Sequence, residues 1–488
     1  MSTFNLINGT YQAVSPNLDA EWTMNLYPET QESIGAKVRK ALILAPGKRI
    51  AYQLPEAGIT AQYPVNGRAF VAASNLWELF ADGSKVNRGS LGAMPASPNQ
   101  IISNETQLLI LNNGALFVFT LATNVLAPVD MSQFNGAVMQ IGFTDGYGIA
   151  TLLTSHTFQQ SNLEDFTTWD GLNISTVSLF PDNFTSMICD HREIWFFSAK
   201  KTAAYYNAGA GNPVFIPIQG AFMEFGAASC AAFATVQLDN SIFWLDQDER
   251  GWLVARRAVG YGEQRVSTHA VEFAWQNYPN LTANSVIGYT YQEQGHSFWV
   301  LKFPNATWVY DVAENQWHQR GFFNPISGTY EADHSQSHMF VFGKHLVGDW
   351  ASGNLYQQST SIYSDMGGPL RWVRRSPTIS KENKWLFFSE LEIDIEPGLG
   401  PQPPLLDGDG QPRAPQIMLR WSNDGTKTWT STFILNCGMA GEYNARARKV
   451  QLGRARRRVW EISGADPIPW RIADGYVKSE DSLELVGA

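Results

Sequence analysis

The stretch at residues 106–124, TQLLILNNGALFVFTLATN, contains two apolar runs separated by a short polar segment. At its centre stands Asn113-Gly114, and an Asn-Gly pair readily supplies the two positive φ angles of a type I′ turn. Such a turn joins antiparallel strands directly, so the stretch predicts a β-hairpin. Its aromatic and β-branched residues also suit a pleated, half-buried surface.

Similar hairpin signals recur along the chain. Apolar or aromatic runs flank Asp145-Gly146, Asp239-Asn240, Gln294-Gly295 and Gly343-Lys344, and seven such units are centred near residues 75, 113, 146, 191, 243, 298 and 343. Units of about 40–50 residues with up to four short strands each are typical of propeller blades. The sequence therefore predicts an all-β protein with a β-propeller of six or seven blades over residues 61–361.

The two ends of the chain differ from this repeating part. In residues 362–488, Leu391, Ile393 and Ile395 alternate with acidic residues, which predicts a half-exposed strand. A Pro/Gly-rich loop at 398–415 and further short apolar runs follow. This region is expected to be a β-rich C-terminal module, either a β-sandwich or strands that complete the propeller ring. Residues 1–60 look extended and turn-rich, and they are expected to join that module.

Composition and charge exclude several classes of protein. The chain of 488 residues is 44% hydrophobic and has a net charge of −10, which argues against a surface that binds DNA throughout but allows a local basic patch. Its three cysteines are odd in number and widely spaced, so they predict neither a disulfide framework nor a zinc site. No signal peptide or membrane span is expected. No cofactor or metal is expected either.

A polar turn between two tryptophans, WSNDGTKTWT at 421–430, is close to the Asp-box pattern S-x-D-x-G-x-T-W. Asp424 is expected to accept turn N–H groups, Gly425 to supply a positive φ, and Trp429 to cover the apolar side of the hairpin. The glycine falls one place early, so Thr426 takes the position that glycine usually holds. The interpretation is a structural turn rather than a catalytic one.

Strings at both ends of the chain carry a family resemblance. They are GTYQAVSPNLDAEWTMNLYPE at 9–29, the turn with its second tryptophan at 421–429, a G-x-x-G-E-Y string at 438–443, and L-G-x-x-R-x-R-V followed by E-I-S at 452–463. Together they resemble the packaged-DNA stabilisation proteins, the tail hub or nozzle subunits of short-tailed bacteriophages. The resemblance covers both ends closely and the middle by architecture.

The resemblance implies a structural virion protein and not an enzyme. Members form a hexameric tube below the portal–adaptor ring, retain packaged DNA and provide the channel for its ejection. The implied partners are further copies of the chain, the adaptor (head-to-tail connector), a tail needle or plug, a tailspike or tail fibre, and genomic DNA that passes without sequence specificity. The implied location is the virion tail, after folding in the host bacterial cytoplasm.

A basic run near the C-terminus stands out in this acidic chain. Its seven cations are Arg446, Arg448, Lys449, Arg454, Arg456, Arg457 and Arg458. Three interpretations are open: contact with a neighbouring subunit or the adaptor, contact with DNA phosphates, or a solvated strand face with local ion pairs. Subunit contact is favoured, because a channel that must release DNA should not grip it.

An alternative function is a sialidase-like propeller that binds or hydrolyses glycans. Asp246, Asp248 and Glu249 lie between Trp244 and Trp252, and carboxylates beside aromatic rings are typical of sugar-cleaving sites. This cluster reads as an exposed turn, however, and no arginine clamp or Tyr–Glu nucleophile pair can be assigned.

Two patterns suggest a metal and are rejected. The run at 407–411, DGDGQ, starts like a calcium loop, but Pro412 stands where such a loop needs glycine. His334 and His338 have helical metal-site spacing in a segment that reads as a turn and a strand.

Overall fold

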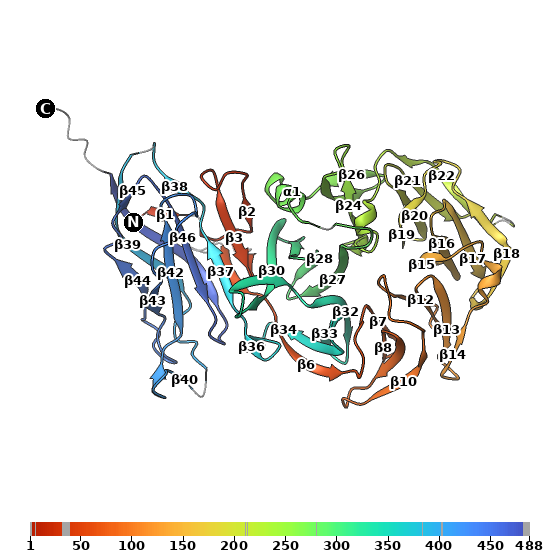
Figure 1. Cartoon of the computed structure of the whole chain (residues 1–488), viewed down its shortest axis with the longest axis horizontal. Coiled ribbons are helices and arrows are strands. Elements are labelled where there is room, and N and C mark those ends of the chain that lie inside the picture. The colour runs from red at the N-terminus through yellow and green to blue at the C-terminus, as the bar shows by residue number, and fades with distance from the viewer. Residues whose placement is uncertain are drawn as a thin grey trace.

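β-strands form almost all of the secondary structure, and they build two units that lie side by side (Figure 1). The computed structural model describes residues 2–4, 6–31, 40–209, 211, 213–279, 281–382, 384–401 and 404–481. The larger unit is a ring of radially arranged sheets, and the smaller unit, mostly blue in Figure 1, consists of two packed sheets.

Five blades of the ring are sheets of four consecutive antiparallel strands. In chain order these strands are β7 (Ala61–Val65), β8 (Arg68–Ala72), β9 (Asn75–Leu79), β10 (Lys85–Ser90), β11 (Gln100–Ser103), β12 (Gln107–Asn112), β13 (Ala115–Thr120), β14 (Val125–Pro128), β15 (Val138–Thr144), β16 (Tyr147–Leu152), β17 (Thr157–Asn162), β18 (Asp165–Thr176), β19 (Phe184–Asp190), β20 (Glu193–Ser198), β21 (Thr202–Asn207), β22 (Phe215–Met223), β23 (Val236–Leu238), β24 (Ser241–Gln247), β25 (Leu253–Val259) and β26 (Gly262–Arg265).

The last two blades include or contact strands from the N-terminal segment. The sixth consists of β27 (Ile287–Glu293), β28 (His296–Lys302), β29 (Thr307–Asp311) and β30 (Gln316–Asn324), and the seventh of β32 (Ser335–Val341), β33 (Lys344–Asp349), β34 (Asn354–Ser359) and β6 (Gly47–Gln53). The inner strand β32 contacts β7 of the first blade. The described residues thus form a seven-bladed propeller whose closing strand, β6, comes from the N-terminal segment. The short strands β35 and β36, which follow residue 362, extend this sheet beyond β6.

The predicted hairpins form for the expected local reason. Asn113 and Gly114 have φ angles of +47° and +80°, and Asp145 and Gly146 have +49° and +84°. The first pair joins β12 to β13 and the second joins β15 to β16. These two-residue turns confirm the prediction that the repeated units contain β-hairpins.

The smaller unit is a β-sandwich. One sheet contains β4 (Leu26–Thr30), β5 (Lys40–Leu44), β47 (Arg471–Asp481), β39 (Leu386–Ile395) and β44 (Ala447–Val450), with β1 (Ser2–Phe4) and β45 (Arg454–Ala455) at its sides. The other contains β3 (Ala20–Met24), β37 (Trp372–Arg375), β46 (Arg457–Gly464), β42 (Gln416–Ser422) and β43 (Phe433–Asn436), with β2 (Tyr11–Gln12) and β38 (Ile379–Ser380).

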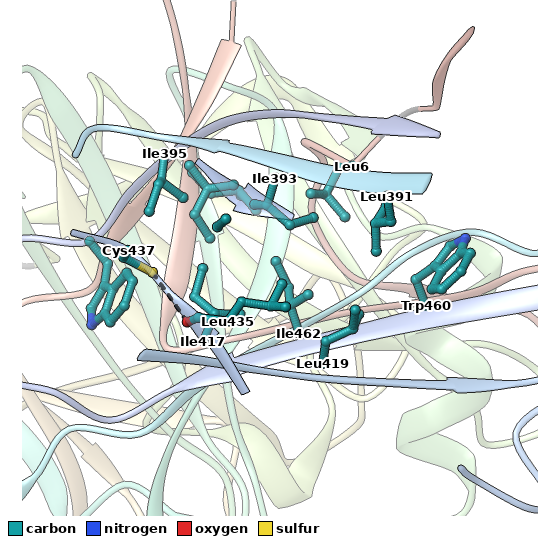
Figure 2. Close-up of a cluster of buried hydrophobic side chains, with 14 of the residues drawn as sticks. Leu6, Leu391, Ile393, Ile395, Ile417, Leu419, Leu435, Cys437, Trp460 and Ile462 are labelled. Carbon is teal, nitrogen blue, oxygen red and sulfur yellow. Dashed lines mark hydrogen bonds between the residues drawn. The ribbon is translucent and has the colours of Figure 1, made fainter. Parts of the chain in front are cut away.

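The core of the sandwich lies between these sheets (Figure 2). Leu391 and Ile393 of β39 face Leu419 of β42 and Ile462 of β46, and all four side chains are buried. The predicted alternation along β39 is therefore present, with its apolar face inward.

The sandwich and the propeller share one continuous sheet. Strand β3 pairs in parallel with β30 of the sixth blade, through Met24 and Gln319, and antiparallel with β37 of the sandwich. Backbone hydrogen bonds, rather than a flexible linker, thus connect the units.

The remaining elements are short. They are β31 (Thr329–Ala332), β35 (Ser364–Asp365), β36 (Gly368–Pro369), β40 (Leu405–Leu406), β41 (Pro412–Arg413), the helix α1 (His269–Gln276), and the 3-10 turns η1 (Met131–Gln133) and η2 (Ser229–Ala231).

Candidate assembly interface

The turn at 421–430 is held by its aspartate. Asp424 Oδ1 accepts hydrogen bonds from Ser422 Oγ at 2.7 Å and from the N–H groups of Lys427 and Thr428 at 3.1 and 3.0 Å. The hydroxyl of Thr428 donates to Asp424 Oδ2 at 2.5 Å. These donors, chiefly the hydroxyl and N–H of Thr428, hold the pKa of Asp424 well below its usual range. The carboxylate therefore organises the turn.

The turn also packs against the N-terminal segment. Gly425 has a φ of +72°, and a Cβ there would lie 2.5 Å from Asn17 Oδ1. Thr426 has a φ of +70°, which is strained for a β-branched residue. The departure from the Asp-box pattern at Thr426 thus has a backbone cost.

The two tryptophans of the turn occupy different places. Trp421 is buried and stacks on Phe433 with ring centroids 5.1 Å apart. Trp429 is half-buried between the guanidinium groups of Arg375 and Arg420, at 5.1 and 4.7 Å from its ring centroid. Trp421 therefore fills the core, and Trp429 contributes to an arginine–aromatic cluster at the edge of the sandwich.

This cluster extends to the propeller. Arg375 and Arg420 both pair with the buried carboxylate of Glu461. Arg375 also lies 5.0 Å from the ring of Trp22, whose Nε1 donates to Gln319 Oε1 of the sixth blade at 2.5 Å. The turn, the sandwich and the propeller are thereby fixed relative to one another.

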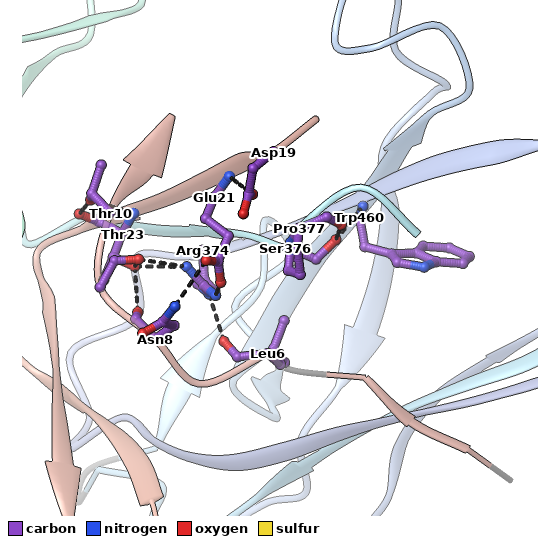
Figure 3. A network of polar contacts seen from close by, with 11 residues as sticks. Leu6, Asn8, Thr10, Asp19, Glu21, Thr23, Arg374, Ser376, Pro377 and Trp460 are labelled. Atoms are coloured by element: carbon purple, nitrogen blue, oxygen red, sulfur yellow. Dashed lines mark hydrogen bonds and ion pairs between the residues drawn. The ribbon is translucent and has the colours of Figure 1, made fainter. Parts of the chain in front are cut away.

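A fully buried arginine, which no sequence pattern above predicts, anchors the N-terminal segment. Arg374 of β37 donates to Leu6 O at 2.6 Å, Gly9 O at 3.1 Å and Thr23 Oγ1 at 2.9 Å, and it pairs with the carboxylate of Glu21 (Figure 3). Arg374 follows Trp372 and Val373 in an apolar strand, and this sequence context could have predicted that it is buried.

The basic run separates into three groups, of which the first is paired locally. Arg446 Nε and Nη2 donate to Glu392 at 2.5 and 2.6 Å, and Arg448 lies 3.7 Å from Glu390. Lys449 Nζ lies over Phe433, 4.4 Å from the ring centroid. The two arginines thus pair with carboxylates of strand β39 in their own sheet, and the lysine lies over a neighbouring aromatic side chain.

The second group is Arg458 alone, which is 1% exposed. It donates to Asn423 Oδ1 at 2.9 Å and Leu452 O at 2.7 Å, and it lies 4.3 Å from the ring centroid of Phe388. Burial lowers its pKa to about 10. Arg458 is a core residue and cannot contact a partner.

The third group is exposed. Arg454 and Arg456 lie over the ring of Trp385 at 4.8 and 5.1 Å, and Arg457 begins β46 beside them. Within the described ranges, none of the three has a carboxylate within ion-pair distance. Trp385 and Phe387 are 38% and 44% exposed. We call Trp385, Phe387, Arg454, Arg456 and Arg457 the basic aromatic end of the sandwich.

The central channel of the propeller is narrow and uncharged. A cavity of about 560 Å³ is lined by the inner strands of all seven blades. Glutamine amides dominate its polar lining, at positions 62, 100, 140, 237 and 336, and none of the described residues that line it is Asp, Glu, Lys or Arg. This described lining lacks the paired carboxylates that a glycosidase needs.

The carboxylates of the alternative sugar site have structural roles. Asp246 is buried and pairs with Arg256 at 2.6 Å, and burial raises its pKa. Asp248 Oδ1 accepts the N–H groups of Arg250 and Trp252 at 2.9 and 2.8 Å. Both carboxylates stabilise the β24–β25 hairpin.

Metal-binding clusters and membrane-spanning helices are absent from the part of the chain that the structure describes. There, no cluster of three or more His, Cys, Asp or Glu side chains could hold a metal ion. His338 and His345 form a hydrogen-bonded pair at 3.0 Å on adjacent strands rather than on a helix. No helix among the described residues has the length and apolar character needed to cross a membrane.

A seven-bladed propeller that shares a sheet with a β-sandwich places the chain in the class of two-unit all-β proteins. Family models make this specific: the model described as bacteriophage P22 Gp10, beta-propeller, matches residues 2–363, and the model described as bacteriophage P22 Gp10, beta-sandwich, matches residues 371–480. The chain belongs to this family. It is a phage structural protein that stabilises packaged DNA, and a component of the virion tail. The family resemblance and the fold class predicted from sequence are thereby confirmed.

Two similar solved structures are distant from the chain in sequence. Virginiamycin B lyase from Staphylococcus aureus is 9% identical, with a TM-score of 0.43 over 64% of this chain and 99% of its own. The extracellular domain of a protein described as a one-component system from B. thetaiotaomicron is 10% identical, with a TM-score of 0.43 over 86% of this chain and 57% of its own. No curated protein matches the chain.

Proposed function

We propose that this chain is the tail hub, or nozzle, subunit of a short-tailed bacteriophage. Copies form a ring, of six on the family pattern, below the portal–adaptor complex. The ring retains the packaged DNA and provides the channel for its ejection. The observation that carries the proposal is the family match over both the propeller and the sandwich.

The size of the propeller channel supports a DNA path between subunits rather than through one. A cavity of about 560 Å³ has the volume of a small-molecule pocket, far below what a DNA duplex needs. The axis of a ring of copies therefore has to supply the passage. A net charge of −10 suits a lining that repels phosphates and lets DNA slide.

The rigid connection between the two units also supports a role as a ring subunit. The shared sheet through β3, together with the Trp22–Arg375–Trp429 cluster, keeps the propeller and the sandwich at one fixed angle. Identical angles in every copy are what a closed ring requires. In this proposal, the adaptor lies above the ring, the needle or plug below, and the tailspike or fibre at the side.

The test uses heads that carry the portal and adaptor but lack this chain. Purified chain is added, and the portal vertex is imaged by electron cryomicroscopy while DNA release is followed with a dye. We expect a ring below the adaptor and retention of DNA. A chain that stays monomeric with adaptor-bearing heads, and leaves the vertex unchanged, would contradict the proposal.

A further inference from the structure

The two ends of the sandwich have opposite character. Strand β39 connects them: Leu386 lies at the basic aromatic end, and Ile395 leads to the loop that contains β40 and β41. Its ten residues place the ends about 30 Å apart, at about 3.3 Å per residue. Figure 1 shows β45 and β38 at one end and β40 at the other.

At the basic aromatic end, an exposed aromatic side chain lies among cations. Trp385 carries the guanidinium groups of Arg454 and Arg456 against its ring, and Phe387 pairs across the sheet with Arg454. Among the described residues, no carboxylate lies within ion-pair distance of these cations. Exposed tryptophan with arginine is the composition typical of interface hot spots.

The opposite end has an apolar socket. A pocket of about 330 Å³ is lined mainly by apolar groups, and its lining residues are Gly400, Pro401, Pro404, Leu405, Arg413, Pro415, Met439 and Ala440. Arg413 is the one cation among the described lining residues, and its charge is neutralised, since its Nη2 and Nη1 donate to the carboxylate of Asp466 at 2.6 and 2.9 Å. The socket therefore suits an uncharged ring.

Acidic residues lie close in the chain to those that line this socket. Asp407 and Asp409 lie in the turn between β40 and β41, and Glu442 caps the turn that follows Met439; all three are exposed. Leu406 and Tyr443, beside them in the chain, are 58% and 71% exposed. We call the socket with these five residues the acidic end of the sandwich.

We infer that the acidic end of one copy receives the basic aromatic end of the next copy in the ring. Trp385 enters the socket, and Arg456 and Arg457 face the carboxylates of Asp409 and Glu442. This inference rests on the proposed function, because it names the contact that closes the proposed ring. Of the seven cations in the basic run, it assigns a role in partner contact to three: Arg454, Arg456 and Arg457.

Charge and shape favour a second copy as the occupant. Two different surfaces of one chain that complement each other make a head-to-tail contact, and such contacts close into rings when the rotation is right. DNA would also accept cations beside aromatic rings. It would leave the apolar socket and its acidic rim at the other end of the same sandwich without a role.

The experiment uses two charge-reversed forms of the full chain. One carries Arg456→Glu and Arg457→Glu, and the other carries Asp409→Arg and Glu442→Arg. We expect each alone to assemble at least 30-fold more weakly than the unmodified chain, measured by mass photometry and on adaptor-bearing heads. A 1:1 mixture should restore rings, because alternating copies in an even-numbered ring place opposite charges at every contact.

Controls separate assembly from folding. Arg446→Gln changes a locally paired arginine of the same run and should leave assembly unchanged. Unchanged circular dichroism and melting of the two reversed forms show that they fold. Trp385→Ala should weaken assembly at least tenfold with the charges intact.

The outcomes also separate this inference from the hub assignment. Normal rings from both reversed forms would overturn this interface and leave the hub intact. Normal rings that lose affinity for a DNA duplex on Arg456→Glu with Arg457→Glu would assign that end to DNA, and so overturn the inference. An unmodified chain that forms no ring, alone or on heads, would overturn both.

Discussion

The N-terminal segment is held by a buried cation in each of the two units, and the cations work differently. In the sandwich, Arg374 distributes its donors over two carbonyls, a hydroxyl and one carboxylate. In the propeller, Lys48 of the closing strand β6 lies between two buried carboxylates, those of Asp333 and, at 3.8 Å, Asp365. The planar guanidinium of Arg374 donates hydrogen bonds to several acceptors at once, whereas the ammonium of Lys48 acts as a point charge.

The difference shows in the titration of the partners. Although burial opposes it, the two carboxylates raise the pKa of Lys48, and Lys48 in turn lowers the pKa of Asp333 against the effect of burial. Burial raises the pKa of Asp365. One cation thus holds two acids in the propeller, while the sandwich cluster pairs one arginine with one acid. As the pH falls, the lowered pKa of Asp333 makes the folded form less stable, whereas the raised pKa of Asp365 acts in the opposite direction.

The largest expected effect on stability comes from removing the guanidinium of Arg374 from the sandwich. Arg374→Met leaves Glu21 buried without its cation and frees the carbonyls of Leu6 and Gly9 from their donor. We expect the free energy of unfolding to fall by about 5 kcal/mol. Urea unfolding followed by tryptophan fluorescence measures this loss. A loss below about 1 kcal/mol would mean that the N-terminal segment is held by other contacts.

Removing the cation from the propeller should have a smaller effect. Lys48→Met leaves Asp333 and Asp365 without a cation, but protonation of Asp365 relieves part of the repulsion, so we expect a loss of about 3 kcal/mol. Arg49→Met is the matched control on the same strand, because Arg49 is exposed and bonds only the side chain of Gln357 among the described residues. It should change stability by less than about 0.5 kcal/mol. Equal losses of stability from Arg374→Met and Lys48→Met would refute this ranking of the two buried cations.

A third prediction tests whether acid acts on the propeller. All eight histidines precede residue 362, and His318 is fully buried, with neither ring nitrogen hydrogen-bonded within the described chain. Burial and the nearby charges of Arg320 and His296 hold the pKa of His318 well below its usual value. Below pH 6.5 the unfolded form takes up a proton that the folded form excludes, so stability falls as pH falls.

His318→Phe should therefore lose less stability than the unmodified chain when the pH falls from 7 to 5, by up to about 2 kcal/mol. His296 works in the opposite direction: burial lowers its pKa, but Asp311 raises it overall, and this pair is unchanged in the variant. Urea midpoints at both pH values measure the difference. Parallel pH dependences of the two proteins would exclude His318 as the titrating group.

The smallest effect is expected at the strained turn of the sandwich. Thr426→Gly should stabilise the protein by about 0.5 kcal/mol, since glycine adopts a φ of +70° without steric cost. Lys427→Gly, at the next exposed position with an ordinary φ, should destabilise it slightly. Thermal melting of the three proteins gives the order. A Thr426→Gly variant that melts below the unmodified chain would show that the threonine contacts outweigh the strain.

Local patterns predicted the blades because turn chemistry acts over a few residues. Asn113-Gly114 and Asp145-Gly146 specify their hairpins wherever they occur. The alternation along β39 likewise fixes which face is buried. The closing strand β6 gave no such signal, because its partner, at 354–359, is about 300 residues away.

Charge patterns located the candidate interface only in part. Arg457 and Arg458 are neighbours in the sequence, yet alternation along β46 places one outside and the other in the core. The pairing of Arg446 with Glu392 depends on the register of β44 against β39, which is set by tertiary structure. Which arginines remain available to a partner could therefore be decided only from the fold.

The origin of β6 also has a consequence for the order of events during synthesis. Its residues leave the ribosome about 300 positions before the strand that pairs with them. Until then its edge has no partner within the blade, and an unpaired edge invites wrong pairing between nascent chains. Completion of the seventh blade is thus a late step of biogenesis, and subunits truncated before residue 354 cannot close the circle of blades.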